Sequence, residues 1–166
     1  MKAKLIIEDK EIEVEISEEE YKKLQSSETG YERVSKRGDY FHESGKGNVE
    51  SEIEDCYDVD DEYYESANYY SDKTVAENNA RADKLVRQLR RFAVEHRKRG
   101  VNFNDINTEK YYISYSYEDN KFWVTYKFSA KSFGTIYFDS REVANAAINE
   151  FREELIWYFT EYKDSL

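Results

Sequence analysis

Apolar and polar residues alternate at the N-terminal end of the chain. In residues 11–16, glutamate alternates with isoleucine and valine, so one side of this segment is apolar and the other is acidic. A short apolar run precedes this alternation, and the two together predict a β-hairpin. Ser17, followed three residues later by Glu20, is the pattern of a helix N-terminus. We therefore expect a short helix over residues 18–25.

Short strand patterns, separated by turn residues, recur along the rest of the chain. They come in two groups of three, and each group is followed by a long helix pattern. In the second group the turns are short, which predicts a three-stranded antiparallel meander. The six segments are 30–34, 39–44, 48–54, 111–117, 122–129 and 133–139.

Two long helices are predicted after these groups. The first covers about residues 75–98, with Thr74 and Glu77 as its capping residues, and the second begins after Ser140. The chain has no proline, so we expect neither helix to be broken. The stripes at helical spacing consist of Ala82, Leu85, Val86, Leu89, Phe92, Ala93 and His96 in the first helix and Val143, Ala144, Ala147, Ile148, Phe151, Leu155, Tyr158, Phe159 and Tyr162 in the second.

A weak internal repeat relates the two halves. Residues 68–80 and 136–148 share an aromatic pair, a polar cap and a Val-Ala pair at the start of a helix. The sequence therefore predicts an α+β fold with a mostly antiparallel sheet and two long helices, in which a β-β-β-α unit is used twice. We expect a single domain over 1–166, divided into the N-terminal hairpin and short helix (1–29), a first unit (30–100) and a second unit (101–166).

Composition indicates a folded, acidic protein. The 166 residues include 16 Tyr, 9 Phe and 2 Trp, whereas disordered acidic chains are poor in aromatic residues. The net charge is -11, and residues 1–72 carry 22 acidic and 9 basic side chains. A field of this sign repels nucleic acid and attracts basic partners. With one cysteine and no apolar run near the roughly 20 residues that span a bilayer, we expect an intracellular protein without a membrane segment.

Motifs for catalysis, cofactors and metals are missing from the sequence. No glycine-rich phosphate loop occurs, and the two histidines lie in different predicted elements. Cys56 has acidic neighbours, whereas reactive cysteines lie in electropositive surroundings. The segment 58–69 lacks the glycine and the final glutamate of a calcium loop. We therefore expect no enzyme activity, no cofactor and no metal.

One segment has an unusual composition. Residues 54–72 contain eight carboxylates and five tyrosines but no lysine or arginine. A solvated, solubilising surface is the simpler interpretation. However, the segment lies inside the folded pattern, and tyrosines are favoured at interfaces. An acidic, tyrosine-rich surface that imitates nucleic acid is the alternative, and its predicted partner-binding residues are Glu50, Glu52, Glu54, Asp55, Asp58, Asp60, Asp61, Glu62, Tyr57, Tyr63 and Tyr64.

The first long helix is basic on its polar side, which leaves a second hypothesis open. This side could be a solvated face that pairs with the acidic segment, or it could contact nucleic acid in a regulatory protein, helped by stacking of bases on tyrosine-rich strands. A third hypothesis is a self-associating structural or assembly protein, such as a homodimer. The residues of the alternative nucleic-acid contact are Arg81, Lys84, Arg87, Arg90 and Arg91.

Three segments resemble a family of small proteins from phages and prophages of Gram-positive gut bacteria. They are residues 30–34 (GYERV), 68–97 (NYYSDKTVAENNARADKLVRQLRRFAVEHR) and 133–162 (FGTIYFDSREVANAAINEFREELIWYFTEY). Some members of this family are similar to anti-CRISPR proteins that inhibit type II RNA-guided nucleases. The resemblance implies counter-defence in the host cytoplasm, by a non-enzymatic inhibitor that binds a basic, nucleic-acid-handling protein. A type II CRISPR nuclease holds nucleic acid in a positively charged channel, which an acidic surface could occupy.

Overall fold

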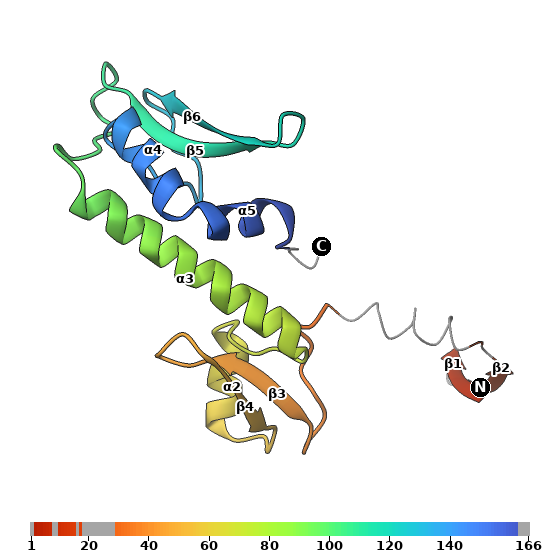
Figure 1. Ribbon diagram of the computed structural model, residues 1–166. Coiled ribbons are helices and arrows are strands. Elements are labelled where there is room, and N and C mark those ends of the chain that lie inside the picture. Colours follow the sequence, from red (N-terminus) through yellow and green to blue (C-terminus); the bar gives the residue numbers. More distant parts are fainter. Residues whose placement is uncertain (1, 8–9, 16, 18–28, 163–166) are drawn as a thin grey trace. The chain divides into compact units, whose positions relative to one another are not determined.

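The computed structural model describes residues 2–7, 10–15, 17 and 29–162. These residues form an α+β fold with three antiparallel two-stranded sheets and the helices labelled α2 to α5 (Figure 1). No helix among them is long and apolar enough to cross a membrane. The chain divides into two compact units, the second of which includes the short segment Gly45–Asn48, and the main boundary between them falls between Ala76 and Glu77. This boundary lies inside helix α3 (Lys73–Glu95), whereas the sequence pattern placed it after residue 100.

The N-terminal hairpin that the alternating residues predict is confirmed by the backbone pairing. Strand β1 (Lys2–Ile7) pairs with strand β2 (Lys10–Glu15), and Leu5 lies opposite Ile12. The short helix predicted over 18–25 lies outside the described residues.

The first unit combines a hairpin with a short helix. Strand β3 (Asp39–Glu43) pairs with strand β4 (Val49–Ile53), and helix α2 (Asp58–Glu65) follows them. The prediction of a strand at residues 30–34 is wrong. Residues 30–34 form no strand in the structure. The Glu32 carboxylate instead accepts hydrogen bonds from the backbone N–H groups of Thr29 and Gly30. The third sheet segment of this unit is Tyr70 instead, which exchanges two backbone hydrogen bonds with Phe41 at 2.8 and 2.9 Å.

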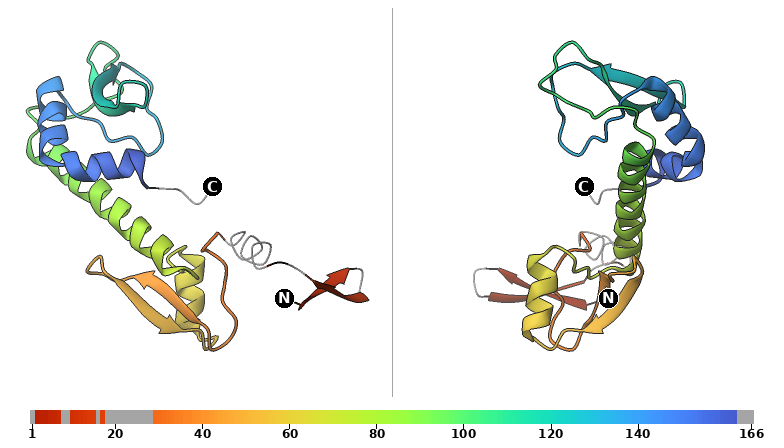
Figure 2. Two further views of the ribbon diagram at one scale, coloured as in Figure 1. Left: turned by 45° about the vertical axis from the view of Figure 1, so that its right-hand side comes forward. Right: turned by 90° about the vertical axis from the view of Figure 1, so that its left-hand side faces the viewer.

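The second unit contains a hairpin and two helices besides most of α3. Strand β5 (Lys110–Ser116) pairs with strand β6 (Lys121–Lys127), and helix α4 (Arg141–Glu150) packs against both (Figures 1 and 2). The predicted meander is wrong in its order. The third segment returns to β5, where Phe138 exchanges two backbone hydrogen bonds with Tyr111, because this position buries Phe138 in the core. The buried core cluster consists of Leu85, Leu89, Phe138, Val143, Ala144, Ala147, Ile148 and Leu155.

The last helix is broken, contrary to the prediction from the absence of proline. At Phe151 the backbone leaves the helical conformation (φ -108°, ψ 24°), and helix α5 (Arg152–Thr160) begins there. The Phe151 ring packs edge-on against Phe92 of α3, with ring centroids 5.6 Å apart. The break therefore coincides with an aromatic anchor in the core. Trp157 of α5 is also buried, although the predicted stripe did not include it.

The two units repeat one arrangement, in which a hairpin, a bridging residue and a helix follow one another. The bridges Phe41–Tyr70 and Tyr111–Phe138 both connect the first strand of the hairpin to the residue two positions before the helix cap. Asp72 caps α3 by accepting the N–H of Val75 (3.0 Å), which corrects the predicted cap at Thr74. Ser140 caps α4 in the same way (3.2 Å), as predicted. The equivalent alanines, Ala76 and Ala144, are both fully buried.

Candidate functional site: an acidic surface above a buried network

Helix α2 carries four carboxylates on one face. Asp58, Asp61, Glu62 and Glu65 follow the spacing i, i+3, i+4 and i+7, which places side chains on one side of a helix, and all four are exposed. Like charges at this spacing repel one another and destabilise a helix by a few tenths of a kcal/mol per pair. The fold thus maintains a charge arrangement that the isolated helix would disfavour.

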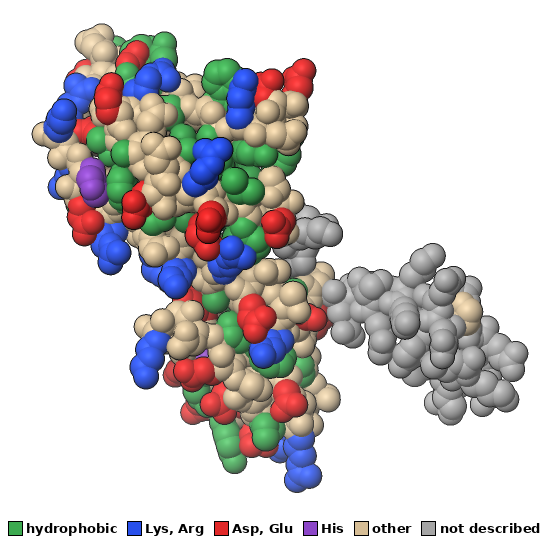
Figure 3. Space-filling model, viewed as in Figure 1, with side chains coloured by type: hydrophobic (Ala, Val, Ile, Leu, Met, Phe, Trp, Pro, Cys, Tyr) green, Lys and Arg blue, Asp and Glu red, His purple; other side chains and the backbone are tan. Residues whose placement is uncertain are grey.

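Strand β4 extends the acidic surface. Glu50 lies opposite His42 and Glu52 lies opposite Tyr40, so both glutamates belong to the sheet face that carries these two buried residues. They alternate along the strand, about 7 Å apart, and both are exposed. Acidic side chains of this unit are visible in Figure 3. Six exposed carboxylates therefore lie on two adjoining elements.

Exposed apolar side chains lie among these acids. Tyr57 at the N-terminus of α2 is 66% exposed, and Tyr64 is 44% exposed. Val59 in α2 is also largely exposed. Solvated acidic surfaces do not need such groups, whereas interfaces use them as anchors. We call Glu50, Glu52, Asp58, Asp61, Glu62 and Glu65, with Tyr57, Val59 and Tyr64, the acidic surface.

Glu54 does not belong to this surface, although the sequence placed it there. It is 1% exposed, and its carboxylate accepts hydrogen bonds from Arg33 Nε (2.9 Å), Arg33 Nη2 (3.0 Å), the Tyr69 hydroxyl (2.9 Å) and the backbone N–H of Cys56 (2.9 Å). The Arg33 guanidinium, more than the other donors, lowers the pKa of Glu54 to about 2. With four donors around it, Glu54 is a structural anion that no partner can reach.

Asp60 is the second buried acid of the predicted site, at 3% exposure. Its carboxylate accepts hydrogen bonds from the backbone N–H groups of Asp55 (3.1 Å) and Tyr57 (2.9 Å) and from the hydroxyl of Tyr40 (2.9 Å). Asp60 is the third residue of α2, so its bond to Tyr57 is that of a capping box. It fixes the start of the helix instead of facing a partner. Asp55 is half-buried at the same turn.

Stacked aromatic rings lie beneath the acidic surface, in the core of the first unit. Tyr40 stacks on Tyr69 with ring centroids 4.1 Å apart, and His42 stacks on Tyr63 at 4.1 Å. Tyr63, predicted as a partner-binding residue, is therefore in part a core residue and is half-buried. Burial, and then the hydrogen bond to Glu54, raises the pKa of Tyr69 to about 12.

Sequence reasoning missed Arg33, which ties the unit together. It binds Glu54 and also Asp61 of α2, with Nη1 2.5 Å from the Asp61 carboxylate, and its guanidinium lies 5.6 Å from the ring centre of Tyr64. Arg33 comes from a segment 21 residues before Glu54. The acidic segment itself, without any basic residue, gave no signal for this pairing.

The basic side of α3 is partly engaged within the second unit. Arg81 forms a bidentate ion pair with Glu154 (2.8 and 3.2 Å) and lies over the Trp157 ring. Arg91 lies 3.9 Å from Glu95. Lys84 and Arg90 are exposed, and the described residues provide no ion pair for them. Arg87 is also exposed, but it interacts with another group of the chain. The predicted nucleic-acid contact thus consists of fewer accessible cations than the sequence indicated.

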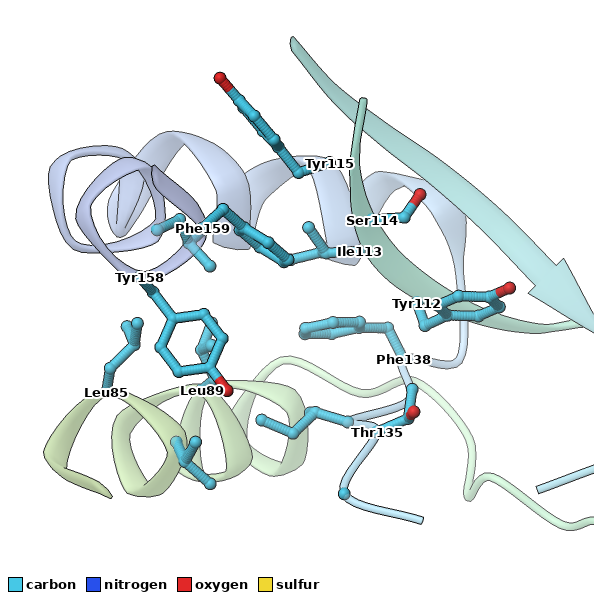
Figure 4. A pocket seen from close by; sticks show the side chains of 14 residues that line it. Leu85, Leu89, Tyr112, Ile113, Ser114, Tyr115, Thr135, Phe138, Tyr158 and Phe159 are labelled. Atoms are coloured by element: carbon cyan, nitrogen blue, oxygen red, sulfur yellow. The ribbon is translucent and has the colours of Figure 1, made fainter. Parts of the chain in front are cut away.

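The second unit also contains an apolar pocket that the sequence did not predict. Its volume is about 390 Å³, and it is enclosed by α3, by residues 112–115 of β5, by residues 134–136 and by α5. Figure 4 shows Leu85 and Leu89 on one side and Ile113 and Phe159 on another. Pockets of roughly 300–1,000 Å³ lined by apolar residues are typical ligand or peptide sites.

The described residues contain no group of three potential metal ligands. Cys56 is exposed. Comparison of the chain with protein-family models, with curated proteins and with solved structures finds no match in any of the three.

Proposed function

We propose that the protein is a non-enzymatic inhibitor whose acidic surface binds a basic, nucleic-acid-handling protein. The observation that carries this proposal is the arrangement of six exposed carboxylates of β4 and α2 with the exposed side chains of Tyr57, Val59 and Tyr64. Carboxylates on alternate residues of a strand are about 7 Å apart, and the distance between successive phosphates of a nucleic-acid strand is of similar size. The tyrosines supply the apolar anchors that an arginine-rich interface favours.

Rigidity of this surface supports the same proposal. The Arg33–Glu54 pair and the Asp60 cap hold α2 against the sheet, so the carboxylates of α2 are held in place before a partner binds. A surface that is ordered before binding loses less conformational entropy on association. The buried acids thus contribute to binding through the position of the exposed ones.

The nature of the partner follows from the resemblance to phage and prophage proteins described above. We infer a role in counter-defence in the host cytoplasm, with a type II RNA-guided nuclease as the first partner to test. Such a nuclease binds its nucleic acids in a positively charged channel and reads a short duplex motif with arginines. The acidic surface would occupy a part of that channel.

The test is DNA cleavage by a panel of guide-loaded type II nucleases, with and without this protein. The key variant neutralises four exposed acids of the acidic surface: Glu50→Gln, Glu52→Gln, Asp58→Asn and Glu62→Gln. The matched control neutralises four exposed acids of the second unit: Asp83→Asn, Glu118→Gln, Glu150→Gln and Glu153→Gln. Both variants change the net charge equally, so the proposal requires that only the first loses inhibition and binding.

Salt provides a second readout. Binding of the wild type should weaken as the salt concentration rises, because the Debye length falls from about 10 Å at 0.1 M to about 3 Å at 1 M. The absence of inhibition and binding across the whole panel would overturn the choice of nuclease. Equal activity of the two neutralised variants would overturn the acidic surface itself as the binding site.

The accessible cations of α3 support a second candidate, direct binding of nucleic acid. Lys84 and Arg90 are the exposed cations without an ion pair in the described part of α3. Gel shifts on single- and double-stranded DNA at low salt discriminate between the candidates. Binding that is lost on Lys84→Glu with Arg90→Glu, and retained in the neutralised acidic-surface variant, would favour this second function.

A further inference from the structure

The free edge of strand β5 borders the apolar pocket of the second unit. Tyr111 directs its N–H and C=O away from β6, since it exchanges both hydrogen bonds with Phe138. Alternate residues of a strand direct these groups to the same side, and the pairing with β6 continues without interruption from Lys110 to Ser116. The N–H and C=O groups of Ile113 and Tyr115 therefore point away from β6 as well. The described part of the chain provides no hydrogen-bond partner for them.

The first unit closes the equivalent edge with a side chain. There, Phe41 and Tyr70 take the places of Tyr111 and Phe138. Two residues further along the strand, Glu43 donates its N–H to Asn68 Oδ1 (2.7 Å) and accepts a hydrogen bond from Asn68 Nδ2 (2.9 Å). Asn68 lies two residues before the bridging residue Tyr70, so its side-chain amide replaces the next pair of a third strand.

The second unit lacks this closure. The position equivalent to Asn68 is Ile136, two residues before Phe138, and isoleucine can neither donate nor accept a hydrogen bond. Instead of closing the edge, residues 134–136 form the far wall of the pocket, opposite residues 112–115 of β5. The same fold thus has a plugged edge in one unit and an open, apolar-walled edge in the other.

We propose that this groove binds an extended, apolar peptide segment of a partner protein, which adds a strand to β5. The backbone of the segment would bond to Ile113 and Tyr115, and alternate apolar side chains would enter the pocket between α3 and α5 (Figure 4). A single strand fits because the groove has a wall on each side. The edge of a second folded sheet would collide with residues 134–136, which argues against pairing with a second copy of this chain.

The charge near the groove specifies the segment further. A second hollow, of about 480 Å³, shares Gly134 and Thr135 with the pocket and is also lined by Arg90 and Lys131. An acidic residue at that end of the bound segment would lie near these two cations. The preferred segment is therefore an alternation of apolar and polar residues with an acidic flank. This binding is independent of the acidic surface of the first unit.

The experiment selects linear decapeptides from a phage-displayed random library on the full-length protein. The most enriched peptide is then synthesised with a fluorophore, together with a copy whose alternate amides are N-methylated. We expect enriched peptides to alternate apolar and polar residues and to carry an acidic flank. Binding should slow the hydrogen exchange of the Ile113 and Tyr115 amides, whereas the Tyr112 amide, which points to β6, serves as the internal control.

Two variants test the site. Ile136→Asn introduces the plug of the first unit and should weaken binding at least tenfold, whereas Ile136→Val, its control, should leave binding nearly unchanged. Val86→Phe fills the groove from α3 without touching the strand edge and should also weaken binding. Circular dichroism checks that each variant is folded.

Three results would overturn the proposal. The first is that the library yields no more enriched peptides on the wild-type protein than on the Ile136→Asn variant. The second is equal affinity of the N-methylated peptide, which would mean that the strand edge is not used. The third is a wild-type dimer in sedimentation that Ile136→Asn dissociates, which would assign the edge to a second copy of the chain.

Discussion

Replacing Glu54 with Gln should destabilise the first unit by about 3 kcal/mol at neutral pH. Four donors surround the Glu54 carboxylate, and the amide group of Gln would itself be a donor facing some of them. Removing one partner of a buried ion pair typically costs about 3–5 kcal/mol. The lower end applies because the side chain of Arg33 is 33% exposed and can regain water.

The lowered pKa of Glu54 reflects the same pair with Arg33 and corresponds to a similar magnitude. It falls from 4.5 to about 2 in the folded protein, and each unit corresponds to 1.36 kcal/mol, which again gives about 3 kcal/mol. Because the folded-state pKa is the lower one, this contribution is complete above about pH 4.5 and is lost as the pH falls toward 2. The difference between wild type and Glu54→Gln should therefore shrink across this interval.

Hydrogen exchange is the suitable assay, since both tryptophans lie in the second unit. The amides of Phe41 and Tyr70, which bridge the first unit, should exchange faster in the variant. Those of Tyr111 and Phe138 should change little. Glu52→Gln, an exposed neighbour, is the control and should shift stability by less than about 0.5 kcal/mol. A loss below about 1 kcal/mol in Glu54→Gln, or a difference that does not depend on pH, would refute the assigned role of this pair.

Three further predictions concern single side chains. Asp72→Ala and Ser140→Ala should each cost about 1 kcal/mol in urea unfolding, because each removes a helix N-cap; no loss in either would contradict the cap assignments. Glu65→Lys should stabilise the first unit by a few tenths of a kcal/mol by relieving repulsion with Asp61 at i+4 spacing, which thermal unfolding would detect. Tyr64→Ala should lower affinity for the basic partner without changing the salt dependence of binding, as an apolar anchor does; a changed salt slope in titration calorimetry would argue otherwise.

Local patterns in the sequence were sufficient for the fold class and for several elements. Alternation identified the N-terminal hairpin and placed Glu50, Glu52 and Glu54 on one face of a strand. It could not show that only Glu54 is buried, because that depends on Arg33, 21 residues away. For the same reason, the order of strands was missed, since the return of Phe138 to β5 is a long-range choice made by the core.

Helix α2 shows a different limit. Its sequence, Asp58–Glu65, has few good helix formers, and its composition predicted an acidic surface without indicating a helix. Its carboxylates have helical spacing, but an amphipathic helix is recognised by an apolar stripe, and this segment has few apolar residues. The break at Phe151 could not be predicted in this way, because no local helix-breaking residue marks it.

Helix α3 belongs to both compact units, and this limits how the protein can be divided for expression. A fragment that ends near Gly100 would contain the acidic surface but also the stripe Leu85, Leu89 and Phe92, which packs within the second unit. Without that unit, the stripe would be open to water over several helical turns, and we expect such a fragment to aggregate. A fragment that begins at Gly100 would lack the same stripe and leave its core uncovered. The acidic surface is therefore best studied by substitution in the full-length chain, since truncation in the loop after α3 would damage both halves at once.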